Sequence, residues 1–81
     1  MGKLLAKTEA RIIIYLSVAD KLLCNVTAIA HKMELDYYYI SKVLLKLHAM
    51  GYLTRIHKHH KVFYELTATA PLKEAKARLI T

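Results

Sequence analysis

The segment between Asp36 and Gly51 constrains the fold of this chain more than any other part of the sequence. At the 3.6-residue spacing of a helix, one face of the segment carries Ile40, Val43, Leu44 and Leu47. Asp36 is a favourable N-cap, and Gly51 stands where a C-cap glycine is expected. We therefore predict a helix from Tyr37 to about Met50 whose apolar face packs into a core.

Two further helices and a short strand are predicted before this segment. Apolar residues recur at helical spacing from an N-cap at Thr8 to about Ala19, which indicates a first helix. Residues 22–26 favour a short strand, and Thr27 then caps a helix over residues 28–33. That helix is too short to be stable alone, so it needs the following helix as a packing partner.

A hairpin and a last helix are predicted after Gly51. Residues 52–56 and 62–67 are rich in β-branched and aromatic side chains, and they flank a basic tip at residues 57–61. Pro71 suits the first turn of a helix over about residues 70–80. The chain is therefore predicted to be mainly α with a small β-hairpin, in the order helix, strand, helix, helix, strand, strand, helix.

Length and charge limit the function classes. The 81 residues are expected to form a single domain, residues 1–81. Thirteen Lys and Arg against six Asp and Glu give a formal charge of +7, which favours a polyanionic partner, either nucleic acid or an anionic membrane surface. The longest apolar stretch, Ile12 to Ala19, is far shorter than the ~20 residues of a membrane helix. We expect an intracellular, cytoplasmic protein with no membrane partner.

Three stretches of the sequence resemble the winged helix-turn-helix of MarR-, ArsR- and PadR-type regulators. They are residues 26–30, residues 38–53 and residues 64–67. The second is similar to the S-x-V-L-x-x-L recognition helix that ends in G-x-L, and the third to the Y-x-L-T strand of the wing. The chain is also as compact as the small winged-helix proteins of archaea and their viruses. In place of the usual Gly or Ser, the turn here is Glu34-Leu35-Asp36.

The resemblance implies a sequence-specific double-stranded DNA-binding protein that regulates transcription. The helix-turn-helix would span about residues 27–50, the wing about 52–67 and the last helix about 70–80. The third helix would enter the major groove with its N-terminal half. The residues expected to contact DNA from this helix are Tyr37, Tyr38, Tyr39, Ser41, Lys42 and Lys46. Tyr38, Ser41 and Lys42 face away from the predicted core, so they are the candidates for base contacts.

The hairpin tip is the second candidate DNA contact. Its residues are Arg55, His57, Lys58, His59, His60 and Lys61, with no acid between Tyr52 and Tyr64. Such a tip can hold phosphates or enter a minor groove. Three histidines also suggest zinc, but adjacent histidines on a strand do not aim at one ion and no Cys, Asp or Glu lies beside them. We expect no metal and no cofactor. The single cysteine, Cys24, excludes an intramolecular disulfide.

The apolar content predicts a homodimer. The residues expected at its interface are Ile12, Ile13, Leu16, Leu72, Leu79 and Ile80. No glycine-rich phosphate loop and no nucleophile elbow occur, so we expect no enzymatic activity, and no small-molecule effector is evident. Two alternatives remain open: a winged helix that acts as a protein-interaction adaptor, and one that binds RNA.

Overall fold

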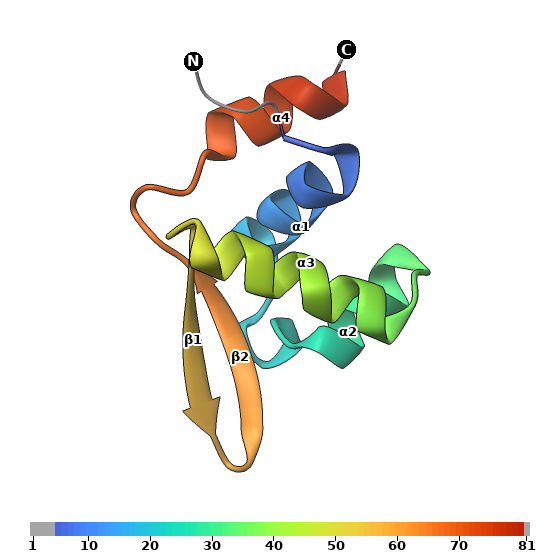
Figure 1. Ribbon diagram of the computed structural model, residues 1–81, viewed down its shortest axis with the longest axis vertical. Coiled ribbons are helices and arrows are strands. Elements are labelled where there is room, and N and C mark those ends of the chain that lie inside the picture. Colours follow the sequence, from blue (N-terminus) through green and yellow to red (C-terminus); the bar gives the residue numbers. More distant parts are fainter. Residues whose placement is uncertain (1–4, 81) are drawn as a thin grey trace.

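The computed structural model describes residues 5–80 and has a helix-turn-helix followed by a two-stranded hairpin (Figure 1). In chain order the elements are α1 (Lys7–Val18), a 3-10 turn η1 (Lys21–Leu23), α2 (Val26–Met33), α3 (Tyr37–Ala49), β1 (Leu53–Lys58), β2 (Lys61–Leu66) and α4 (Leu72–Ile80). The hairpin projects from the helical body on the side away from α4. This is the winged helix that the sequence predicts.

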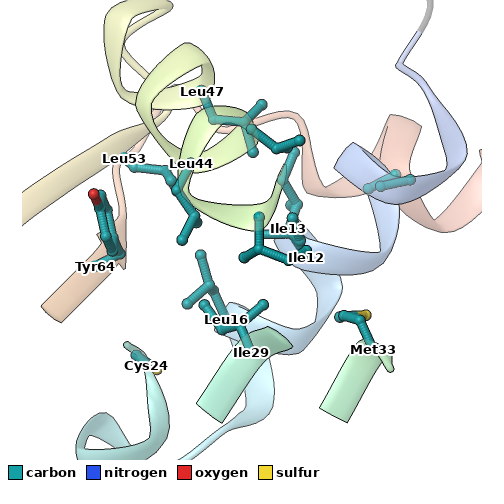
Figure 2. Close-up of a cluster of buried hydrophobic side chains, with 14 of the residues drawn as sticks. Ile12, Ile13, Leu16, Cys24, Ile29, Met33, Leu44, Leu47, Leu53 and Tyr64 are labelled. Atoms are coloured by element: carbon teal, nitrogen blue, oxygen red, sulfur yellow. The ribbon is translucent and has the colours of Figure 1, made fainter. Parts of the chain in front are cut away.

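One core joins the elements. The largest side chains with no exposed surface are Ile12, Ile13, Ile29, Ile40, Leu44 and Leu47, from α1, α2 and α3. Leu53 and Tyr64 of the hairpin and Ala75 of α4 extend the same cluster. Figure 2 shows the labelled members of this cluster pointing toward one another from these helices and the hairpin. The apolar face predicted for the third helix is thus confirmed. Because this face is buried, the opposite face of α3 is exposed to solvent.

Side-chain caps define the helix-turn-helix. Asp36 Oδ2 accepts a hydrogen bond from Tyr39 N at 3.1 Å, as expected for the N-cap of α3. The cap of α2 is Asn25 rather than Thr27, since Asn25 Oδ1 accepts from Ala28 N at 2.9 Å. The helix therefore begins two residues earlier, at Val26.

The first helix also begins earlier than predicted. Glu9 Oε1 accepts a hydrogen bond from Ala6 N at 2.9 Å, which satisfies one of the free amides at the start of α1. Thr8 is therefore inside the helix and is not its N-cap.

The strand predicted at residues 22–26 is absent, and a 3-10 turn takes its place. Asp20 organises this turn because its Oδ1 accepts from Leu22 N at 3.0 Å and its carbonyl accepts from Leu23 N at 2.8 Å. One hydrogen bond still links the segment to the hairpin, from Tyr64 N to Cys24 O at 2.8 Å. The hydrogen bonds of Asp20 thus stabilise a 3-10 turn in place of strand pairing.

The hairpin is tighter than the sequence suggests. The register pairs Leu53 with Leu66 and Lys58 with Lys61, so the loop contains only two residues, His59 and His60. Both have positive φ, at 50° and 64°, which a two-residue type I′ turn requires. The predicted five-residue tip is therefore wrong in extent, because residues 57, 58 and 61 lie in the strands.

Candidate nucleic-acid interface

The solvent face of α3 carries the residues that the sequence proposes for base contacts. Tyr38 is 74% exposed and Lys42 is exposed, whereas Ser41 is half-buried. Tyr37 and Tyr39 flank this face at 48% and 47% exposure. The rings of Tyr37 and Tyr38 meet edge to face with centroids 5.4 Å apart, which orients the Tyr38 ring.

Lys46 has a different environment from its neighbours. Its Nζ lies 2.7 Å from Oε2 of Glu9, whose side chain is only 9% exposed. The hydrogen bond and the charge of Glu9 raise the pKa of Lys46. Sequence reasoning missed this pair because α1 and α3 are far apart in the chain. A lysine that already neutralises a carboxylate is a poorer candidate for a phosphate contact than Lys42.

The hairpin presents its basic side chains to solvent. Arg55, His57, Lys58, His59, His60 and Lys61 are all exposed. Lys58 and Lys61 face each other across the two strands next to the turn. The guanidinium carbon of Arg55 lies 6.0 Å from the centroid of the ring of Tyr64, its cross-strand partner, which is within the range of a cation–π contact. Lys58 and Lys61 therefore place two cations beside the turn, and Arg55 adds a third further along β1.

A groove connects the hairpin tip to the helix-turn-helix. Its volume is about 670 Å³, and it is lined by the start of α2, by Tyr37 of α3 and by His60 and Lys61 of the hairpin. Thr27 and His31, both exposed, add a hydroxyl and an imidazole from α2. Neither residue is among those predicted from the sequence, although their i, i+4 spacing on the polar side of α2 is a signal that could have identified them.

The structure corrects half of the predicted dimer interface. Ile12 and Ile13 have no exposed surface and Leu16 is 8% exposed, because α4 and β2 pack on α1 and these side chains belong to the core of the single chain. Assigning these three side chains to an interface was wrong. Leu72 is half-buried and Leu79 is 38% exposed, while the side chain of Ile80 lies outside the described residues.

The thiol of Cys24 is buried and donates to the carbonyl of Asp20 at 3.4 Å. Burial, together with the charges of Asp20 and Glu65, raises the pKa of this thiol. Among residues 5–80, no three His, Cys, Asp or Glu side chains gather closely enough to hold a metal ion. No helix in the same part of the chain is long and apolar enough to cross a membrane.

Comparisons with known proteins identify the fold. No protein-family model matches the chain, and no curated protein sequence matches it. Several solved structures match the chain. The zinc-dependent MarR family transcriptional regulator AdcR in its Zn(II)-bound state aligns with a TM-score of 0.75 and 19% identity, over 99% of this chain and 56% of that chain.

A second protein gives the same result. The zinc-responsive MarR family member ZitR from Lactococcus lactis aligns with a TM-score of 0.78 and 19% identity, over 99% of this chain and 58% of that chain. Wild-type ZitR in complex with DNA aligns at 0.75 and 22%, over 99% and 57%. The chain thus spans little more than half the length of these structures. Along almost its whole length, it has the winged-helix fold found in MarR family transcriptional regulators.

Proposed function

We propose that this chain is a sequence-specific double-stranded DNA-binding protein and a transcriptional regulator without catalytic activity. The observation that carries the proposal is the groove between α2, the start of α3 and the hairpin tip, where Tyr37, His31, His60 and Lys61 converge. A helix start and a cationic hairpin on one side of a small domain suit a duplex, because both elements can meet the same DNA segment. The DNA complex of the similarly folded ZitR supports this proposal.

The third helix, α3, and the hairpin have different roles in the proposed DNA complex. Lys42 and Tyr38 contact base edges in the major groove, with Ser41 beside them. Arg55, Lys58 and Lys61 neutralise phosphates or enter the minor groove, and the wing histidines His57, His59 and His60 add hydrogen-bonding groups beside them. Phosphate contacts set the register and most of the affinity, while base contacts set the preferred sequence.

We further propose a homodimer acting in the cytoplasm. With Ile12, Ile13 and Leu16 buried, the candidate contact is the side of α4 that carries Leu72 and Leu79. A two-fold dimer would place two copies of α3 about 34 Å apart on one side of DNA. Light scattering at tens of micromolar tests this, since a monomer mass at that concentration would contradict it.

Selection of bound sequences from a random DNA pool, followed by a salt titration on the selected duplex, tests the function. We expect one enriched motif and an affinity that falls steeply with salt. A matched RNA duplex should compete poorly, and effective competition would favour the RNA-binding alternative. No salt-sensitive binding to any duplex would contradict the proposal. That result would favour the alternative of a protein-interaction adaptor, for which the exposed Val18, Leu22 and Leu23 offer an apolar surface.

A further inference from the structure

The exposed face of α3 lacks most side chains that read bases by hydrogen bonds. The helix contains no Arg, Asn, Gln, Asp or Glu. These residues, with Lys, are the usual bidentate or single partners of guanine, adenine and cytosine in the major groove. The chain has no Gln at all, and both ends of the Asn25 amide are occupied, by Ala28 N and by the carbonyl of Leu22.

Most of the remaining polar side chains of α3 already have a partner within the chain or are partly buried. Lys46 pairs with Glu9 at 2.7 Å, and His48 Nδ1 lies 2.9 Å from the carbonyl oxygen of Leu53. Ser41 is half-buried. Lys42 is therefore the one cation of α3 that has no ion-pair partner within the described part of the chain. A single lysine specifies too little sequence to define a binding site.

Apolar surface fills the rest of the same face. Leu45 is 45% exposed, three residues after Lys42 and seven after Tyr38. At 100° per residue these three side chains lie on one stripe, opposite the buried Ile40, Val43, Leu44 and Leu47. Leu45 is thus a large aliphatic side chain at the C-terminal end of the stripe that Tyr38 and Lys42 begin.

On the basis of the proposed function, we propose that Leu45 is a specificity-determining residue that reads the 5-methyl group of a thymine. The thymine methyl is the apolar group that base pairs present in the major groove, and it is the natural contact for an aliphatic side chain there. Tyr38 contacts a second thymine. The rise of 1.5 Å per residue separates the two side chains by about 10.5 Å, close to three base-pair steps of about 3.4 Å. Lys42 lies between them and donates to the intervening base.

The test replaces thymines of the selected duplex one at a time with deoxyuridine, which removes the methyl group and keeps every hydrogen-bonding atom. For the wild-type chain we expect about fourfold weaker binding at one thymine per half-site for Leu45, the equivalent of exposing one methyl group. A second sensitive thymine, for Tyr38, should lie about three steps away. Leu45→Ala should lose the first sensitivity and keep the second. Alanine favours helix, so α3 should persist.

Leu22→Ala is the matched control, because Leu22 is 74% exposed but lies in η1, outside α3. It should behave as the wild type at every thymine. The proposal is overturned if the wild type binds its selected site with no sensitivity to deoxyuridine, or if Leu45→Ala retains the full pattern. It is also overturned if Leu45→Ala changes the mass measured by light scattering, since Leu45 would then serve an interface. Absence of any duplex binding would instead contradict the proposed function itself.

Discussion

Nζ of Lys46 lies 2.7 Å from Oε2 of Glu9, so an ion pair joins the second half of α3 to the first turn of α1. Glu9 Oε1 also accepts from Ala6 N, and one carboxylate therefore caps α1 and anchors α3. We predict that Lys46→Ala leaves the slope of log affinity against log salt for DNA almost unchanged, because this lysine already has an anionic partner. Fluorescence anisotropy on one duplex measures the slope, and a loss of about 0.9 would show that Lys46 binds phosphate.

Lys58→Ala should behave differently in the same titration. Lys58 is exposed next to the hairpin turn, and each lost phosphate contact flattens the slope by about 0.9. Selected and random duplexes should be weakened alike, since phosphates carry no sequence information. Lys73→Ala on α4, also exposed but distant from the hairpin, is the control and should match the wild type. If both substitutions have the same effect, DNA binding depends on the overall charge of the chain and not on a contact made by Lys58.

The turn between α2 and α3 contains a strained residue. Glu34 has φ of 56° at the C-cap of α2, a left-handed conformation that favours glycine. Glu34→Gly should raise the free energy of unfolding by about 0.5–1 kcal/mol, after the greater flexibility of glycine in the unfolded chain is deducted. Glu34→Ala removes the charge but not the strain. If urea denaturation shows the same gain for both variants, the strain explanation fails.

Stability should fall at alkaline pH through Cys24 and Tyr15. Burial raises the pKa of the Cys24 thiol, as do the charges of Asp20 and Glu65, and burial with the Cys24 charge raises the pKa of Tyr15. The folded chain therefore keeps protons that the unfolded chain loses above about pH 8.5. The stabilisation is complete below that pH and is lost as the pH rises through the folded values. Urea denaturation should show a shallower alkaline decline for Cys24→Ala, and an identical decline would contradict this.

The sequence predicted the α3 face and the hairpin because both depend on local periodicity. Ile40, Val43, Leu44 and Leu47 are buried as predicted, and the two strand segments pair in one hairpin. Hydrogen bonds of polar side chains shifted the boundaries elsewhere. Those of Glu9, Asp20 and Asn25 moved two helix starts and replaced a strand, and each involves a choice among competing local partners.

The candidate site was less predictable than the fold. Which lysines of α3 are available depends on Glu9, which lies in α1 and contacts α3 only after folding. The contribution of His31 depends on how α2 packs beside the hairpin tip. The predicted dimer residues Ile12 and Ile13 show the same limit, because an apolar stripe does not indicate whether the same chain or a second copy covers it.

The specificity of Lys42 tests the central claim most directly. Lys42 is exposed on the α3 face, so its truncation should leave the fold intact. The measurement is the ratio of affinities for the selected and random duplexes, for the wild type and Lys42→Ala at one salt concentration. The account predicts that the substitution reduces this ratio by the equivalent of about 1–3 kcal/mol, the value of a good base contact. A ratio that stays at the wild-type value, with both duplexes weakened equally, would contradict the assignment of α3 as the helix that reads the sequence.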